Sequence, residues 1–452
     1  IPIGTETYVQ QQLENLTREQ TAALDKLQHF GCAESFVLLK SCFNTRPIYT
    51  MRGISPHLTT AMAASHDNQM EIALASSIGL ASLSPTSVAV KNLPASLGGL
   101  GMRGMTALHR GAWVSSWLKS LQFARELFGR FFERWYRPVQ FDMGVIREFF
   151  TDIPDGGDMA AVVLPILEST DEIPTQKVLV AKQDAAKHQT LLNSLKASDP
   201  LKASWLSSAS TKGISSWLYI ASNPLQGISI SEDAYRDSLR LRLMVDVFDD
   251  PSHIRRRCEP CHCSDIDNFH ALSCKGPSEI RKKRHDYIRN HVAKFLETVR
   301  PTMNVVKELT IPNALRGKPT CIADLSFTDS NQLKFLDVAI SNPSTTRAAS
   351  RSLSDRAGAT AAEKEKEKQN KYKSSYGESI LTHLVPFAIE STGRLGHMAE
   401  SFLSAMARSD DRRDDRRVKS AKLLLSRQIA ATLVEFNSKL FRVTRNKTII
   451  IR

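Results

Sequence analysis

A short segment of the chain carries four of its seven cysteines, at positions that suit a metal ion. Cys258 and Cys261 are separated by two residues, so one tight turn can direct both thiolates at the same ion. His270 and Cys274 lie one helical turn apart and can reach that ion from the start of a helix. These four residues predict a complete zinc shell, in which Cys263 could replace Cys258 or Cys261.

Basic residues flank this segment on both sides and are placed to meet phosphates. They are Arg255, Arg256 and Arg257 before it, and Lys282, Lys283 and Arg284 after it. The whole chain is also basic, with 60 Lys and Arg against 47 Asp and Glu and a formal net charge of +13. This balance favours a polyanionic partner, most simply nucleic acid. A charge run is more often a solvated face, and that alternative stays open.

Two aspartates stand in the middle of β-type runs, where aspartate is normally depleted. Asp324 lies in the run 321–327, and Asp337 lies in the run 335–340. If the intervening segment 329–332 turns symmetrically, the two aspartates lie directly opposite each other on one face. Like charges repel there unless a cation lies between them, and Mg²⁺ with oxygen ligands would remove the repulsion. A three-residue loop would instead place them on opposite faces, and solvated aspartates on an exposed hairpin are the other alternative.

The charged helix expected from Ala357 to Ser375 places lysines on its packing face. At 100° per residue one line along this helix collects alanines, lysines and a tyrosine. Its members are Ala357, Ala361, Lys364, Lys368, Lys371, Tyr372 and Ser375. A lysine near two metal-binding carboxylates can position the attacking water and neutralise charge on a phosphate. The alternative is a solvated helix with Glu/Lys pairs.

These residues together predict Mg²⁺-dependent hydrolysis of a phosphodiester. Asp324 and Asp337 would hold the metal, and Lys368 or Lys371 would assist the water. Glu308, on the preceding β-type run, would contribute as an outer ligand.

The length of 452 residues implies several domains. We expect a mostly α-helical N-terminal two-thirds, a small zinc module and a C-terminal α/β domain. The boundaries are a helical region at 1–130, a helical linker at 131–245, the zinc module with a basic helix at 246–300, the α/β domain at 301–405, and a charged linker with a C-terminal helix at 406–452. Strands are expected at 305–311, 321–327, 335–341 and 385–389. Three glycines in 93–103 predict a tight, positive-φ connection before a helix starting at Met105.

Neither a membrane-spanning stretch nor a secretory leader is apparent in the sequence. The odd number of cysteines argues against a disulfide framework and for a reducing compartment, so an intracellular protein is expected. The chain opens at Ile1 instead of Met, which suggests a fragment whose upstream partner is absent.

The chain resembles the C-terminal half of proteins encoded by non-LTR retrotransposons that carry a restriction-like endonuclease. The segment from Leu93 to Arg103, with Ala112 to Trp117, is similar to the thumb of their reverse transcriptases. The Cys-Cys-His-Cys set is similar to their zinc knuckle, and the two acidic runs are similar to their nuclease of the PD-(D/E)xK type. The resemblance implies a thumb-like region at 1–130, a CCHC knuckle at 246–300 and a restriction-endonuclease-like fold at 301–405.

The nuclease motif departs from the ordinary pattern at two positions. The lysine usually found two residues after the second acid is replaced by Ala339, and Thr320 follows Pro319 where an acid is expected. In this retrotransposon class the lysine comes from the following helix, so the resemblance gives that role to Lys368 and Lys371.

The resemblance implies a reverse transcriptase/endonuclease fragment that nicks target DNA in the nucleus and also meets element RNA. Polymerase activity would need an upstream palm, because the one nearby acidic pair, Asp249 and Asp250, is followed by Pro251, which argues against a paired strand. One alternative is a catalytically inactive, zinc-containing nucleic-acid binder. Another is a helical scaffold with an incidental zinc site.

Overall fold

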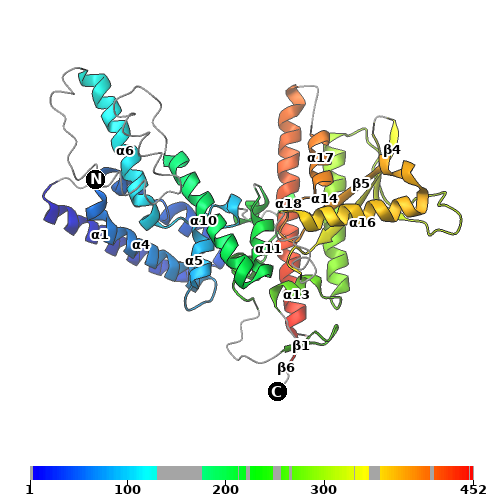
Figure 1. Ribbon diagram of the computed structural model, residues 1–452, viewed down its shortest axis with the longest axis horizontal. Coiled ribbons are helices and arrows are strands. Elements are labelled where there is room, and N and C mark those ends of the chain that lie inside the picture. Colours follow the sequence, from blue (N-terminus) through cyan, green and yellow to red (C-terminus); the bar gives the residue numbers. More distant parts are fainter. Residues whose placement is uncertain are drawn as a thin grey trace. The chain divides into compact units, whose positions relative to one another are not determined.

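The computed structural model describes residues 4–129, 176–211, 213–219, 224–247, 256–263, 267–329, 331–345, 357–407, 412–446 and 448–450. It is mostly helical and carries a small mixed sheet of four strands in its C-terminal part, as expected (Figure 1). The chain divides into two compact units. The N-terminal unit comprises Ile1–Pro94 and Gly99–Leu191, and the C-terminal unit comprises Ala95–Gly98 and Leu192–Arg452.

The N-terminal unit is a group of helices packed around α4 (Pro56–Ser77). Helix α1 (Glu6–Asp25) lies along α4, and their apolar residues, including Leu13 and Met62, meet in one buried cluster. Helix α6 (Met105–Phe128) packs against both α3 (Ile48–Gly53) and α4. The other elements of this unit are η1 (Lys26–His29), α2 (Cys32–Leu38), η2 (Leu39–Phe43), α5 (Pro85–Asn92) and most of α10 (Gln176–Ser198). The end of α10 and the short η3 (Ala95–Leu97) belong to the C-terminal unit.

The glycine-rich connection before α6 is as tight as predicted. Gly98 and Gly101 have φ values of 83° and 69°, a region that glycine enters at little cost. At Gly99 the restriction is steric, because a Cβ atom there would lie 2.1 Å from the carbonyl oxygen of Leu93. Helix α6 then starts under Asp67, whose Oδ1 accepts a hydrogen bond from the Met105 N–H at 2.5 Å.

The sheet of the C-terminal unit has the order β2-β3-β4-β5. Its strands are β2 (Val306–Thr310), β3 (Ile322–Asp329), β4 (Gln332–Ser341) and β5 (Leu384–Glu390), which confirms the four predicted runs. The first three strands pair antiparallel, and β5 pairs parallel to β4. Helix α16 (Ala359–Tyr376) lies between β4 and β5 in the sequence, as a parallel connection requires.

Helices cover both faces of this sheet. Leu336 and Val338 of β4 point into an apolar core with α14 (Ser278–Val299), α17 (His397–Met406) and the long helix α18 (Arg412–Asn446), which runs beside the sheet in Figure 1. The neighbouring residues of β4 point the other way. There Ala339 packs with Ala361 of α16 and Ala388 of β5, so α16 approaches the strands closely.

A second sheet of two strands joins distant parts of the C-terminal unit. Strand β1 (Arg256–Cys258) pairs antiparallel with β6 (Thr448–Ile450). The other elements are α11 (Pro200–Ala209), η4 (Ile214–Tyr219), η5 (Pro224–Gln226), α12 (Glu232–Arg242), α13 (Asn268–Ser273) and η7 (Glu378–Thr382). The charged block before the last helix was expected to be a linker, but from Arg412 onward it belongs to α18.

Some predictions fall outside the described residues, namely those on Arg255, on the Asp249 and Asp250 pair, and on the part of the helical linker from 131 to 175. Within the described part of the chain, the helices are all too short or too polar to span a lipid bilayer.

Gly99→Ala should destabilise the N-terminal unit by about 2 to 3 kcal/mol, because the added methyl group overlaps two backbone oxygens that cannot move freely. Thermal unfolding of the purified chain measures the effect. Ser96→Ala, at an exposed position in the same connection, is the matched control and should stay within about 0.5 kcal/mol of the parent. Equal stability of the Gly99 variant would contradict the close approach.

Candidate active site and candidate metal centre

The structure brings together the four predicted zinc ligands. Sγ of Cys258 lies 3.4 Å from Sγ of Cys274, and Sγ of Cys261 lies 3.5 Å from Nε2 of His270. The ligand atoms of all four residues lie within 4.8 Å of one another. Two sulfurs bound to one tetrahedral zinc ion are about 3.8 Å apart, so these distances suit that ion. The group could hold a metal ion, and its three thiols and one imidazole are the donor set of zinc.

A tight turn and the first turn of a helix position these ligands. The Cys258 N–H donates to the carbonyl oxygen of Cys263 at 2.8 Å, and the His262 N–H donates to that of Cys258 at 2.7 Å. Asp267 caps α13 and accepts a hydrogen bond from the His270 N–H at 2.6 Å, which fixes the first turn of that helix. The predicted alternative ligand, Cys263, contributes its carbonyl to the turn and lies outside the cluster, with an exposed side chain.

The flanking basic residues do not all reach the surface. Arg257, Lys282 and Lys283 are exposed, and Lys283 pairs with Glu279 at 2.7 Å. Arg284 is only 3% exposed and donates a hydrogen bond to Oδ1 of Asn437 at 2.6 Å. Burial lowers its pKa to about 10. Arg284 therefore joins α14 to α18 in the interior and does not lie with the phosphate-facing residues predicted beside it. Of Arg256 only the backbone is described, in β1.

The acidic hairpin has the predicted symmetric register. Its pairs run from Asp329 with Gln332 to Leu325 with Leu336, and the three-residue loop is excluded. Asn331 in the turn has a φ of 61°, as a two-residue hairpin loop favours. The register continued by one residue places Asp324 opposite Asp337, and each carboxyl group does affect the pKa of the other.

Asp324 is held on one of its carboxylate oxygens. Its Oδ2 accepts a hydrogen bond from the Val338 N–H at 2.6 Å and lies 3.1 Å from Nε2 of His285 on α14. The same Nε2 lies 3.2 Å from the carbonyl oxygen of Val338. The carboxylate and the imidazole therefore contact the backbone of β4 just beyond the last pair of the hairpin.

Asp337 is held on the opposite side by α16. Its Oδ1 accepts a hydrogen bond from Nζ of Lys368 at 2.6 Å, and its side chain is 4% exposed. Its Oδ2 is buried and has no hydrogen-bond partner among the described residues. A buried polar atom without a partner is costly, so this oxygen marks a place where a ligand would be stabilising.

The two carboxyl groups act on each other. Burial raises the pKa of Asp337, and the charge of Asp324 raises it further, while Lys368 offsets part of this effect. Burial alone would raise the pKa of Asp324 too, but the hydrogen bond and charge of His285 outweigh it and lower that pKa. Burial alone would lower the pKa of His285, yet Asp324 and Asp286 together raise it. Asp324 therefore ionises more readily than an ordinary aspartate, and Asp337 ionises less readily.

Anchors at both ends of α16 fix the position of Lys368. At the start of the helix, Oε1 of Glu390 accepts a hydrogen bond from the Thr360 hydroxyl at 2.6 Å. Toward its end, the hydroxyl of Tyr372 donates to the carbonyl oxygen of Ile322 at 3.2 Å. Lys371 was the other predicted lysine, but it is exposed, with Nζ 5.5 Å from the centre of the Tyr372 ring. The structure therefore places Lys368, and not Lys371, at the acids.

Glu308 lies on β2 beside the part of β3 that carries Asp324, but its carboxylate contacts Arg289 instead of the acids. Its neighbours on β2 pair with Ala323 and Leu325. Its φ of 57° interrupts the regular strand, and its carboxylate forms an ion pair with Arg289 of α14. The structure brings Glu308 to the rim of the candidate site, engaged with Arg289 and largely exposed.

Sequence reasoning missed the contribution of α14. His285 and Arg289 reach Asp324 and Glu308 from one side of this helix, four residues apart. The sequence carried a signal for this contribution, because both residues lie next to the buried face of α14 that includes Ile288 and Val292. Polar side chains beside a buried face need hydrogen-bond partners. The spacing could not predict which strand His285 and Arg289 would contact.

No protein-family model matches this chain, and no curated protein matches it either. The chemistry of the site is therefore inferred from its own geometry. Two facing carboxylates, one amine and one imidazole can bind a divalent cation and move a proton at neutral pH.

Cys274→Ser should abolish stoichiometric zinc in the purified chain, because three remaining ligands bind zinc far less tightly than four. Elemental analysis by mass spectrometry measures the metal content. Cys263→Ser is the matched control and should retain zinc, since that thiol lies outside the cluster. Equal loss of zinc in both variants would show that the ligand set is wrong.

In the absence of Mg²⁺, His285→Gln should lower the free energy of unfolding by on the order of 1 kcal/mol near pH 5 to 6. The raised pKa of His285 gives stability that is fully present below about 6.5 and fades as the pH rises through the folded value. The lowered pKa of Asp324 gives stability that is present above about 4 and fades as the pH falls. Urea unfolding from pH 4 to 9 tests this, with exposed His29→Gln as the control. A difference that grows toward pH 9 would contradict the ion pair.

Proposed function

We propose that the C-terminal unit is a Mg²⁺-dependent endonuclease that nicks DNA. The observation that carries this proposal is the buried, unpartnered Oδ2 of Asp337 beside the carboxylate of Asp324. Removing charge repulsion between two such acids requires a proton or a cation. A hard divalent cation with oxygen ligands suits the site better than a proton at neutral pH.

The residues around the acids suit hydrolysis of a phosphodiester. Bound Mg²⁺ would supply a Lewis acid for the phosphate and lower the pKa of an attacking water. Lys368 supplies a positive charge from a rigid helix, where it can stabilise charge that develops on the phosphate. Asp324 keeps a lowered pKa and stays ionised as a ligand, since His285 and the Val338 N–H support its charged form.

The resemblance to retrotransposon proteins agrees with this site. Two acidic strands, a lysine helix and a further strand follow one another in the order that it implies. We propose that the chain is part of a reverse transcriptase/endonuclease, with target DNA and element RNA as partners in the nucleus. The zinc cluster and the exposed Arg257, Lys282 and Lys283 would then position the nucleic acid.

One observation favours a rival, a catalytically inactive nucleic-acid binder. Without metal, Asp324 already has His285 as its partner and Asp337 has Lys368. The acids would then serve only to join α14 and α16 to the sheet. The rival retains the zinc cluster and the basic surface and lacks nicking activity.

Asp337→Asn and Asp324→Asn should each reduce Mg²⁺-dependent nicking of supercoiled DNA below detection, because each removes a metal ligand. Lys368→Gln should slow nicking by about 100-fold, since it removes a charge that acts on the transition state. Lys371→Gln, one turn away and exposed, is the matched control and should nick at the parental rate.

DNA retention by all four variants is measured in parallel at low salt and should match the parent. Parental nicking by Asp337→Asn would refute the proposal. Absence of nicking by the parent, with intact DNA retention, would support the inactive binder.

A further inference from the structure

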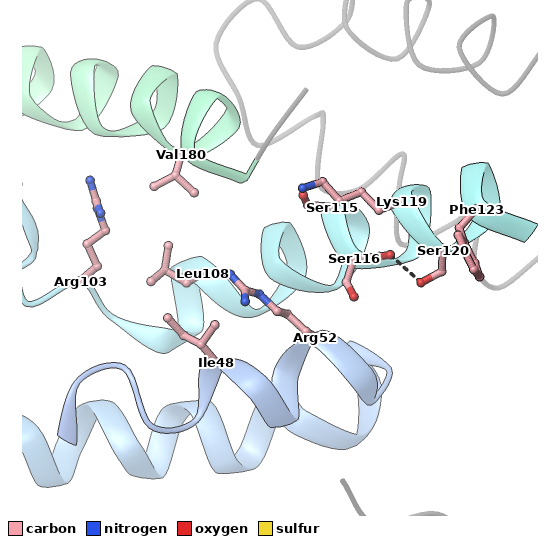
Figure 2. A pocket seen from close by; sticks show the side chains of 10 residues that line it. All are labelled: Ile48, Arg52, Arg103, Leu108, Ser115, Ser116, Lys119, Ser120, Phe123 and Val180. Carbon is pink, nitrogen blue, oxygen red and sulfur yellow. Dashed lines mark hydrogen bonds between the residues drawn. The ribbon is translucent and has the colours of Figure 1, made fainter. Parts of the chain in front are cut away.

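The N-terminal unit contains a cleft of about 710 Å³ between α3, α6 and α10 (Figure 2). Several polar side chains in its lining contact other groups of the same unit. Arg52 lies over the ring of Tyr49, with its Cζ 5.8 Å from the ring centre. The Ser120 hydroxyl donates to the backbone carbonyl oxygen of Ser116 at 2.9 Å, which Figure 2 draws as a dashed line. These contacts lie within the protein itself and do not indicate a ligand.

A smaller pocket, of about 190 Å³, lies wholly within the C-terminal unit. Its walls come from α17, α18, η4 and the turn that follows β5. Asp324, Asp337 and Lys368 do not line it, so it is separate from the proposed nuclease. A cavity of about 150 Å³ is large enough for a benzene molecule. This pocket can therefore accept one apolar side chain of about the size of leucine.

The floor of this pocket is apolar and belongs to the main core of the unit. Leu403 of α17 and Leu425 and Ile429 of α18 are buried there, in the cluster that also covers the sheet. Ile214 of η4 and Leu395 of the turn complete the apolar lining. Such a floor favours an apolar group and excludes a charged one.

Two opposite charges lie on the solvent side of the pocket. Glu400 of α17 is exposed, and Lys422 of α18 is half-buried. Nζ of Lys422 donates to the hydroxyl of Ser404 at 3.2 Å, and within the described residues it forms no ion pair with Glu400. Ser404 lies one helical turn beyond Glu400, about 5.4 Å along the axis. A ligand that carries both an ammonium and a carboxylate group can bridge this separation.

The turn after β5 contributes a third charge that is already engaged. Arg394 donates three hydrogen bonds, at 2.8 to 3.1 Å, to backbone carbonyl oxygens at the C-terminal end of α11. Those carbonyls carry the negative end of the helix dipole and compensate the guanidinium. Thr211, in the same wall, has a buried Oγ1 without a hydrogen-bond partner among the described residues. A polar ligand atom near this hydroxyl would relieve that cost.

We infer that this pocket binds a free amino acid with an apolar side chain of about the size of leucine. The side chain enters the apolar floor, the α-ammonium group meets Glu400, and the α-carboxylate meets Lys422. The interior of a peptide carries neither charge, and a fatty acid or an alkylamine carries only one, so each of them leaves a charged group of the pocket without a partner. The inference rests on α17, α18 and the turn between β5 and α17, and it does not depend on the proposed nuclease.

Isothermal titration calorimetry of the full chain with L-leucine tests this inference, and one molecule should bind per chain. The matched ligands are 4-methylpentanoate, which is leucine without its ammonium group, and isoamylamine, which is leucine without its carboxylate. Each should bind at least about 10-fold more weakly than leucine, because one charge-assisted hydrogen bond is lost. Equal affinity for leucine and 4-methylpentanoate would overturn the assignment to an amino acid. Absence of leucine binding at millimolar concentration would refute the inference.

Variants of the chain assign the binding to this pocket. Lys422→Gln and Glu400→Gln should each weaken leucine binding by about 10-fold. Ser426→Leu should abolish it, because a half-buried side chain of the lining then fills the pocket. Arg427→Gln, exposed on another side of α18, is the matched control and should bind leucine as the parent does. Thermal unfolding without leucine checks that each variant is folded.

Unchanged leucine affinity in Lys422→Gln and Ser426→Leu would refute the site. Absence of nicking by the parent chain, together with intact leucine binding, would count against the proposed nuclease alone.

Discussion

The C-terminal unit depends on one electrostatic constraint, namely that two carboxylates, one buried and one half-buried, lie close together on a β-hairpin. Asp324 and Asp337 cannot both ionise there without positive charge nearby. Without metal that charge comes from two helices on different sides of the strands, through His285 of α14 and Lys368 of α16. The acids therefore determine where both helices pack, and the helices determine how readily each acid ionises.

Two further acids hold helices in place by hydrogen bonds. Glu390, 1% exposed, accepts hydrogen bonds from Thr360 of α16 and from Ser208 of α11. Glu365 of α16 in turn accepts hydrogen bonds from the first N–H groups of α17. Glu365, and Glu390 through the Ala361 N–H, thereby accept from backbone donors in the first turn of a helix, which have no partner within that helix. Lys368 consequently projects from a helix fixed to its neighbours, and this rigidity is what the proposed nuclease would require of the amine.

Sequence reasoning reached the strands, the hairpin register and the zinc ligands because these follow from local rules. Alternation, turn symmetry and ligand spacing act over short stretches of chain. It could not separate Lys368 from Lys371, since both fall near one helical line and only the position of the sheet decides between them. Arg284 illustrates the same limit, because its burial depends on α18, far away in the sequence.

The pairing of β1 with β6 closes the C-terminal unit into a loop that begins at the zinc cluster and ends at the last strand. Closing so long a loop is entropically expensive, so three residue pairs can form only after the helices and the sheet have brought the ends together. We therefore expect this small ribbon to form late and to fray early. Since Cys258 belongs to it, a metal ion bound at the Cys/His cluster would hold one strand of the ribbon in place.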